Sequence, residues 1–408
     1  MGDRLPTSSV SQEVSGETRT PWSAADPVRP RRILFDAPAF MMGGMERQIV
    51  DLATGLVNRG HHVAIVVNKS ADDVYRDAIA SSGAEFTVLG RTNRFDPRVF
   101  SDLIGIVRRW NPDVVVSELF NASLWGRLAG ILSGAGIVVV EHASDREASA
   151  MERWTNRLLG SRTHAVVGCA YGQISSLLAD GQPKDAIVVV HNGVDTALFA
   201  RDEAAGRAFR VEADIADDAF VIGMVAAHRA EKRHDRLIAL AEKLQADGVD
   251  CIVCAVGGGE LFEENVALAR RSPAADRIRF LGPRSDVVGA YSAFQATVLV
   301  SDSIETLPMA FLESQSCETP VVGMRVGGVE ETFAPGVSGF LVEQGDLDEM
   351  ASVIARMSRN PDERLRMGHS GREFVFTNFG LETMIREYED VFGRAAYAAG
   401  KRESTGVR

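Results

Sequence analysis

Residues 301–324, SDSIETLPMAFLESQSCETPVVGM, decide how the rest of the chain is interpreted. The apolar run 296–300 before them is typical of a strand, and PVVGM at their end predicts another. Pro308 suits the first turn of a helix, where its missing N–H would have no partner anyway. The stretch therefore predicts strand, loop, helix and strand, with Glu305 in the loop and Glu313 inside the helix.

The start of this predicted helix is a candidate anion site. The backbone amides of Thr306, Leu307, Met309 and Ala310 are expected to point outward there, where the helix dipole also favours negative charge. Carboxylates would compete with an anion, so the two glutamates make more sense as acceptors for sugar and ribose hydroxyls, with the amides holding a phosphate. Glutamate is a good helix former, so the pair alone is a weak signal, and the flanking strands and the proline give it weight.

Strands alternate with helices along the chain, which is typical of parallel α/β sheets. Runs such as RRILFDA, HHVAIVV, IVVVEH, FVIGMVAA and ATVLVS are almost wholly apolar, so we expect them to be buried on both faces. At 408 residues the chain exceeds what one core usually supports. The sequence predicts two doubly wound Rossmann-like domains of class α/β, divided after HNGVD at 191–195, where Gly193 permits a sharp exit from a strand.

Composition and charge exclude several classes of protein. No apolar run approaches the roughly 20 residues of a membrane span. The first 30 residues lack the apolar core of a signal peptide, so we expect a disordered leader and a cytoplasmic protein. Residues 31–200 hold 17 basic and 18 acidic side chains, and residues 201–395 hold 21 and 33. Because such a field repels phosphate, we expect no nucleic-acid partner, no general attraction to anionic lipid, and at most peripheral contact with the inner face of a membrane.

Metal and disulfide chemistry have no support in the sequence. Cys169, Cys251, Cys254 and Cys317 are too few and too scattered for a disulfide framework. No His, Cys and Asp grouping has zinc-ligand spacing, and no Asp-x-Asp pair stands at a strand end. We therefore expect neither a metal nor a cofactor.

Two features of the first half are candidates for ligand contact. Gly43 and Gly44 stand directly before a predicted helix, where glycines let the backbone approach a ligand and the helix start offers amides to a phosphate. His142 follows the strand 137–140, so it lies at the carboxyl edge of the sheet, where open α/β sheets bind ligands. Each feature has an alternative interpretation without a ligand. The two glycines could simply form a turn, and His142 could be a surface residue that pairs with Glu141. The full GxGxxG fingerprint is absent, which counts against a nicotinamide enzyme.

Cations gather in AAHRAEKRHDRLI, which begins at Ala226. Lys232 opens a predicted helix there, and a cation at a helix start opposes the dipole unless an anion binds. Arg229 is a second cation in the same loop. Gly258 lies in the turn GGGE that ends another predicted strand.

Together, the Glu-x7-Glu pair, the glycines after it and the Lys232 segment resemble the retaining glycosyltransferases of family 4, which have the GT-B fold. The resemblance covers about residues 32–395. It implies two Rossmann-like domains facing across a cleft, and transfer of a sugar from a nucleotide-diphosphate sugar with retention of anomeric configuration. It is nearly silent on the acceptor, which could be a glycan, a lipid-linked molecule or a small molecule.

The resemblance also implies roles. In the family the first glutamate of the motif contacts the donor sugar and the second contacts the ribose. A glycine loop lies against the diphosphate, and a histidine at a strand end lies near the sugar. An arginine and a lysine clamp the diphosphate: Lys232 matches the lysine, but Ala227 stands where the arginine is expected, and Arg229 is close enough to substitute. Thr306 and Leu307 replace the usual Gly–Phe after the first glutamate.

The expected site can now be stated in full. Its catalytic residues are Glu305, His142 and Lys232, and its donor-binding residues are Gly43, Gly44, Arg229, Lys232, Gly258, Thr306, Leu307, Pro308, Met309 and Glu313. The expected organisation is a leader (1–30), an N-terminal domain on the acceptor side (31–195), a linker (196–218), a C-terminal domain on the donor side (219–380), a helix that crosses back (381–397) and a tail (398–408).

Because no nucleophile is evident, the family's front-face mechanism is implied, in which the leaving phosphate takes the acceptor proton. Two alternatives stay open. A sugar-nucleotide epimerase of the same fold would act without an acceptor. A non-enzymatic nucleotide-sugar-binding protein would tolerate the loss of His142 without losing its ligand.

Overall fold

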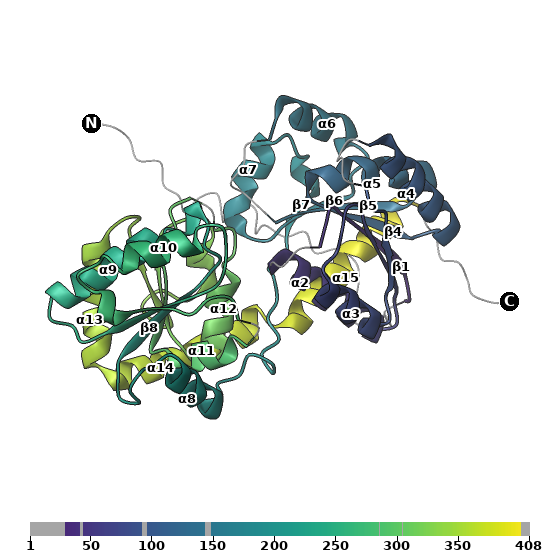
Figure 1. Cartoon of the computed structure of the whole chain (residues 1–408). Coiled ribbons are helices and arrows are strands. Elements are labelled where there is room, and N and C mark those ends of the chain that lie inside the picture. Colours follow the sequence, from purple (N-terminus) through teal and green to yellow (C-terminus); the bar gives the residue numbers. More distant parts are fainter. Residues whose placement is uncertain are drawn as a thin grey trace.

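The computed structural model describes residues 29–40, 44–91, 96–142, 148–284, 286–303 and 305–400, with only the backbone for 120–123. Figure 1 shows these ranges folded around two parallel sheets, each covered by helices on both faces. The predicted fold class is confirmed. No helix within these ranges is long and apolar enough to cross a membrane. Most of the predicted leader and most of the tail lie outside the described residues.

The first sheet, within the described residues, has seven parallel strands in the order β3-β2-β1-β4-β5-β6-β7. They are β1 (Arg32–Ala37), β2 (His62–Val67), β3 (Glu85–Val88), β4 (Val114–Glu118), β5 (Gly136–Glu141), β6 (Ala165–Gly168) and β7 (Ile187–Val189). The helices between them are α2 (Gly44–Asn58), α3 (Asp73–Ser82), α4 (Pro97–Trp110), α5 (Leu119–Ser133), α6 (Ala150–Gly160) and α7 (Ile174–Ala179). Along β1, Ile33 and Phe35 enter one core and Leu34 the other, as expected for a strand buried on both faces.

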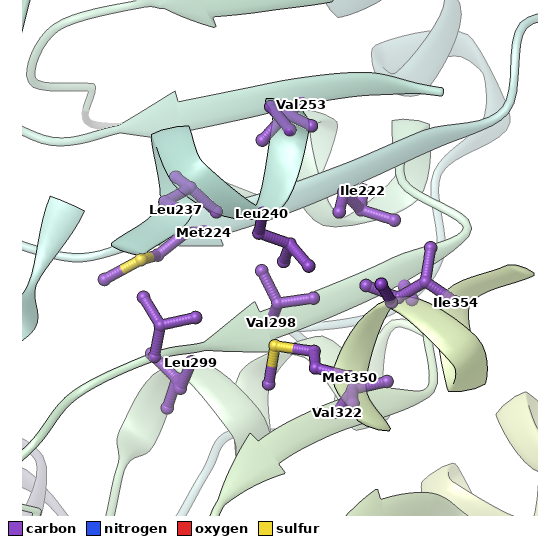
Figure 2. Close-up of a cluster of buried hydrophobic side chains, with 14 of the residues drawn as sticks. Ile222, Met224, Leu237, Leu240, Val253, Val298, Leu299, Val322, Met350 and Ile354 are labelled. Atoms are coloured by element: carbon purple, nitrogen blue, oxygen red, sulfur yellow. The ribbon is translucent and has the colours of Figure 1, made fainter. Parts of the chain in front are cut away.

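The second sheet repeats this arrangement with six parallel strands in the part of the chain that is described, ordered β10-β9-β8-β11-β12-β13. They are β8 (Val221–Val225), β9 (Ile252–Val256), β10 (Ile278–Phe280), β11 (Ala296–Leu299), β12 (Val321–Met324) and β13 (Gly339–Val342). The helices are α8 (Glu203–Glu212), α9 (His234–Ala246), α10 (Phe262–Ala269), α11 (Val288–Ala293), α12 (Met309–Ser316), α13 (Leu347–Arg359) and α14 (Pro361–Asn378). Figure 2 shows one of its cores, where Leu237 and Leu240 of α9 and Ile354 of α13 pack on Ile222 and Val298 of the sheet.

The segment predicted as a linker is not a plain connection. It contains α8, which packs against α11. Phe209 of α8 and Ile215 after it are buried in the second domain's core, and Phe209 meets Phe294 edge to face at 5.6 Å between ring centroids. The prediction of a linker over 196–218 was therefore wrong for α8, because apolar residues spaced along the polar stretch supply one buried face.

The last helix belongs to the core of the first sheet. α15 (Leu381–Ala398) spans the segment for which a helix crossing back was expected, and it packs against β5 and against α2, beside which Figure 1 shows it. Its residues Met384, Ile385, Phe392 and Ala395 are buried in the same cluster as Phe35 of β1. The ring of Phe35 meets that of Phe392 edge to face, with centroids 6.1 Å apart. The first core therefore combines segments from opposite ends of the described chain.

Gly136→Ala is expected to destabilise the fold through this contact. A Cβ built at Gly136 would lie 2.6 Å from the backbone carbonyl carbon of Ala395, so α15 or β5 would have to move. Overpacking of this kind costs about 1–3 kcal/mol, measurable by urea unfolding. Gly105→Ala is the matched control, because a Cβ there meets nothing within 4 Å and a helical Gly→Ala change should stabilise by about 0.5–1 kcal/mol. Equal stability of wild type and Gly136→Ala would contradict this packing.

Candidate active site

Two charged side chains from separate segments meet at the carboxyl edge of the second sheet. Lys232 ends the 3₁₀ turn η3 (Ala230–Lys232) after β8, and Glu305 follows β11, the neighbour of β8 at the point where strand order reverses. Lys232 Nζ donates to Glu305 Oε1 at 2.7 Å, and Ser301 Oγ donates to the same oxygen at 2.6 Å. Glu305 is buried and Lys232 is half-buried. Open α/β sheets bind ligands at such reversal points, so an entering anion would meet a fixed cation.

The loop that carries Glu305 is set by glycines from another turn. Gly328 N donates to the Glu305 carbonyl at 2.8 Å. A Cβ on Gly327, whose φ is +51°, would lie 1.9 Å from the Glu305 carbonyl oxygen, and one on Gly328 would lie 2.0 Å from the Thr306 oxygen. Only glycine permits this close approach of the two backbones. Gly327 and Gly328 therefore help to fix the position of the Glu305 backbone.

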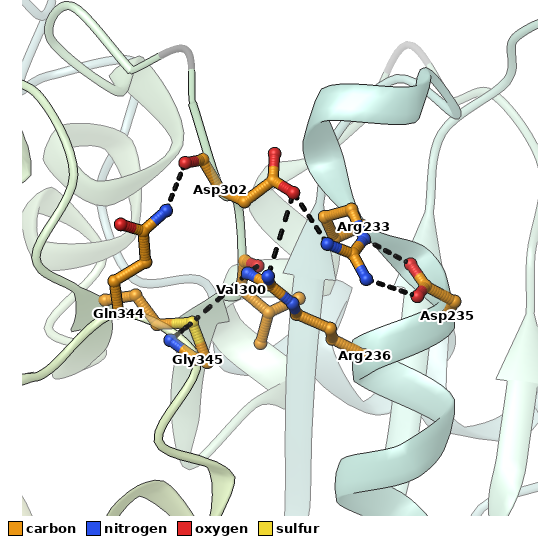
Figure 3. Close-up of polar contacts among 8 residues, drawn as sticks. Arg233, Asp235, Arg236, Val300, Asp302, Gln344 and Gly345 are labelled. Atoms are coloured by element: carbon orange, nitrogen blue, oxygen red, sulfur yellow. Dashed lines mark hydrogen bonds and ion pairs between the residues drawn. The ribbon is translucent and has the colours of Figure 1, made fainter.

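Ion pairs and hydrogen bonds connect the same loop to the turn that carries Lys232, as Figure 3 shows. Arg233 adopts a left-handed conformation with φ of +53° and bridges Asp235 at 2.8 Å and Asp302 at 2.6 Å. Asp302 N also donates to the Glu231 carbonyl at 3.2 Å, and the Gln344 side chain donates to the Asp302 carbonyl. Lys232 and Glu305 are thus held by contacts that do not depend on their own ion pair.

Glu313 lies where the two halves of the chain approach each other. Tyr291 OH donates to its Oε2 at 2.8 Å, and Arg47 of α2 lies 3.9 Å from its Oε1. Burial raises the pKa of Glu313 to about 7, although Arg47 and Tyr291 oppose the rise. Nearby, a Cβ on Gly44 would lie 3.9 Å from Met309 Cγ, so the glycine turn of the first half faces the start of α12. The structure therefore brings Gly44, Met309 and Glu313 together.

His142 has partners at both ring nitrogens. Its Nε2 lies 2.7 Å from Glu118 Oε2, and its Nδ1 lies 3.6 Å from Cys169 Sγ. Burial alone would lower the pKa of His142, but the Cys169 sulfur and the Glu118 carboxylate together raise it well above its usual range. Because both ring nitrogens of His142 already have a partner, a substrate hydroxyl that formed a hydrogen bond to the ring would compete with Glu118 or with Cys169.

The loop after β8 brings Arg229, Lys232 and Gly258 close together along the backbone. Lys232 N donates to the Arg229 carbonyl at 3.1 Å, and His228 N donates to the Gly258 carbonyl at 2.8 Å. The Arg229 side chain is exposed and has no ion-pair partner among the described residues. Arg229 N donates to the Ala227 carbonyl at 2.9 Å, so Ala227 lies in the same turn.

Two predicted site residues, Pro308 and Leu307, lie differently from expectation. Pro308 is the residue before α12 and not part of its first turn, a shift of one position that helix boundaries commonly show. The Leu307 side chain is buried in the second domain's core, so only its backbone could face a ligand. Gly43 lies outside the described residues.

Glu331 joins the two halves directly. It lies in the 3₁₀ turn η5 (Val329–Thr332) of the second half, and its carboxylate accepts hydrogen bonds from Tyr171 N at 2.8 Å and Gly172 N at 2.7 Å. His191 Nε2, also in the first half, lies 3.1 Å from the same carboxylate. These contacts hold the turn that contains Gly327 and Gly328 against the first half of the chain.

The sequence of this chain matches two known protein families. Residues 42–198 match the family described as Glycosyltransferase Family 4, and residues 207–374 match the family described as Glycosyl transferases group 1. The chain is a glycosyltransferase of the family 4 type. The resemblance to family 4 and the prediction of a glycosyltransferase are thereby confirmed, whereas retention of configuration stays a prediction.

Relatives of this glycosyltransferase carry related names. An N-acetyl-alpha-D-glucosaminyl L-malate synthase of Bacillus anthracis is 22% identical, over 86% of this chain and 94% of its own. A D-inositol 3-phosphate glycosyltransferase of Kribbella flavida is 33% identical over 48% of each chain. One from Actinosynnema mirum is 27% identical over 87% of this chain and 95% of its own.

Solved structures share the whole fold of this glycosyltransferase. A glycosyltransferase from Rickettsia africae matches with a TM-score of 0.79 at 20% identity, covering 90% of this chain and 98% of that one. Alr3699/HepE of Anabaena, in complex with UDP, matches with a TM-score of 0.77 at 18% identity, covering 89% and 99%. At these identities the likeness shows the fold, and the predicted GT-B fold is confirmed.

Sequence reasoning missed several residues at this glycosyltransferase's site. Glu118 gave a signal that could have been used, because it is a charged residue at the end of an apolar strand, DVVVSE, where ligands bind. Arg47 also gave one, as a cation one turn after the glycine loop. Tyr291 and Asp302 gave none, since their partners lie 22 and 69 residues away in the chain.

Proposed function

We propose that this glycosyltransferase moves a sugar from a nucleotide-diphosphate sugar to a hydroxylated acceptor with retention of anomeric configuration. The observation that carries the proposal is the contact of Lys232 with Glu305 at the strand reversal of the second sheet. Lys232 would supply the positive charge that stabilises a bound diphosphate, and Glu305 would supply a buried acceptor for the hydroxyls of the sugar. The structurally similar HepE was solved in complex with UDP and with UDP-glucose, which supports this donor class.

The proposed reaction breaks the bond between the sugar's anomeric carbon and the phosphate oxygen. The acceptor oxygen bonds to that carbon from the same face, and its proton passes to the departing phosphate. Lys232, Arg229 and the amides at the start of α12 stabilise the charge that grows on the diphosphate. Glu305 accepts hydroxyls of the sugar, with His142 near it, and Glu313 accepts those of the ribose.

The test is a thermal-shift screen of nucleotide sugars followed by transfer assays. A donor at 100 times its dissociation constant should add about 2.7 kcal/mol of stability. Acceptors in the transfer assay should include L-malate and D-inositol 3-phosphate, which the names of the relatives mention. NMR of the product should show the donor's anomeric configuration. An inverted product would refute retention, and epimerised donor formed without acceptor would favour an epimerase.

Transfer activity is expected to persist in excess chelator. The proposed counter-charges for the diphosphate are Lys232, Arg229 and backbone amides, so no divalent ion is needed to hold it. Within the described ranges, no group of three or more His, Cys, Asp and Glu side chains is placed to hold a metal ion. The measurement compares turnover with and without EDTA. Loss of turnover in EDTA and its recovery with manganese would show this prediction to be wrong.

A further inference from the structure

Helix α6 presents its polar side to the protein and its apolar side to solvent. Its buried residues are Glu152, Thr155, Asn156 and Gly160, and Asn156 Nδ2 donates to the Asp180 carbonyl at 2.9 Å. Its large apolar side chains are exposed: Met151 by 50%, Trp154 by 63% and Leu158 by 58%. These three fall within about 60° of one another around the helix, so they form one outward stripe. Surface helices of globular proteins show the opposite polarity.

The charges beside this stripe are positive. Arg157 and Arg162 are exposed, whereas Glu152, the acidic residue of α6, is buried against Ser149. Arg153 lies on the other side of the helix, where its side chain donates to the Ala148 carbonyl. The chain as a whole carries a net charge of −12, but its excess of acidic residues lies in 201–395. Charges further away than about 10 Å are screened at 0.1 M salt, so the local arginines govern what α6 attracts. Figure 1 places α6 on the outer side of the first half, with α7 beside it.

We propose that α6 docks this protein on an anionic lipid surface. Methionine, leucine and tryptophan side chains would enter the boundary between headgroups and acyl chains, where the indole of Trp154 is well suited to lie. Arg157 and Arg162 would meet the lipid phosphates. This local attraction departs from the expectation, based on net charge, of no general affinity for anionic lipid. It does not depend on the proposed transfer reaction, because binding is measured without donor or acceptor.

The experiment is co-sedimentation of the full chain with two kinds of vesicle. One kind is pure phosphatidylcholine, and the other contains 30% phosphatidylglycerol, a fraction chosen as roughly that of an anionic membrane surface. The wild type is expected to sediment with the anionic vesicles, to do so less in 0.5 M than in about 0.1 M salt, and to bind the neutral ones weakly. Arg157→Gln should weaken partitioning about five-fold, the effect of one arginine near such a surface. Trp154→Glu should weaken it more than about ten-fold.

Phe376→Glu is the matched control, because Phe376 on α14 is an aromatic residue exposed by 67% that lies outside the stripe. It should bind vesicles like the wild type, and thermal melting should confirm that both glutamate variants are folded. Equal binding of Trp154→Glu and wild type, or no binding of the wild type, would overturn the proposal. It would also be overturned by a wild-type dimer that Trp154→Glu converts to monomer in sedimentation velocity, because the stripe would then be a contact between two copies.

Discussion

Replacing Glu305 with glutamine is expected to lower turnover about a hundred-fold or more while the fold survives. The amide has the shape of the carboxylate, and its oxygen can still accept from Lys232 and Ser301, as Glu305 Oε1 does. It presents N–H groups on the other side, however, so a sugar hydroxyl that donates to the carboxylate loses its acceptor. Losses of one preorganised contact of this kind typically cost 10²–10³-fold, or roughly 3–4 kcal/mol. The measurements are kcat and thermal melting.

Glu330→Gln is the control for this variant. Glu330 is an exposed glutamate in η5, next to the glycines that support the Glu305 loop, and it pairs with Arg325 on the surface. Its turnover should stay within about two-fold of wild type, since surface ion pairs contribute little. Near-normal transfer by Glu305→Gln would remove Glu305 from the site, and a large fall in melting temperature would assign it a structural role.

Lys232→Ala is expected to weaken both donor binding and the chemical step. Charge on the diphosphate grows as the sugar leaves, so a cation held against Glu305 contributes more to the transition state than to the bound donor. The expected loss in kcat is again about a hundred-fold. Binding should be measured separately by titration with the nucleotide diphosphate. Unchanged kcat with weaker binding would show that Lys232 only holds the ground state.

The neighbouring arginine decides how the diphosphate clamp is built. If Arg229 has replaced the arginine missing at Ala227, Arg229→Ala should cost about as much as Lys232→Ala, and the double variant should be less than additive. If the exposed Arg229 side chain stays in solvent, its removal should change turnover less than a few-fold, and Ala227→Arg should raise donor affinity. A silent Arg229→Ala together with an Ala227→Arg variant that gains nothing would contradict the clamp inferred from the family.

Local patterns in the sequence were sufficient for the fold. The β/α rhythm predicted both sheets. Local residues also encode where a helix begins, as Asp96 and Pro97 do at the start of α4. The position of a side chain at the end of a strand also follows from the sequence. Lys232 and Glu305 each follow a predicted strand, so a place at the carboxyl edge of a sheet could be predicted for both from the sequence, although their roles stay predictions.

Contacts between segments far apart in the chain could not be predicted in this way. His142 lies 24 residues from Glu118 and 27 from Cys169, and Glu331 lies about 160 residues from Tyr171. Each pair depends on how helices and turns pack once the sheets exist, and no spacing in the sequence encodes that. Helix α8 was missed for a related reason, since its apolar side is recognisable only beside the α11 that covers it.

The position of α15 has a consequence for the order in which the protein can fold during synthesis. The strands of the first sheet end at Val189, but the helix that completes their core begins at Leu381, about 190 residues later. At translation rates of about 5–20 residues per second, that delay is about 10–40 seconds. During it, the apolar face around Phe35 is packed on one side by α2 but lacks the residues of α15. The core of the second half is complete in the chain only at Phe379, two residues before α15 begins, so the half that is made first is the last to be completed.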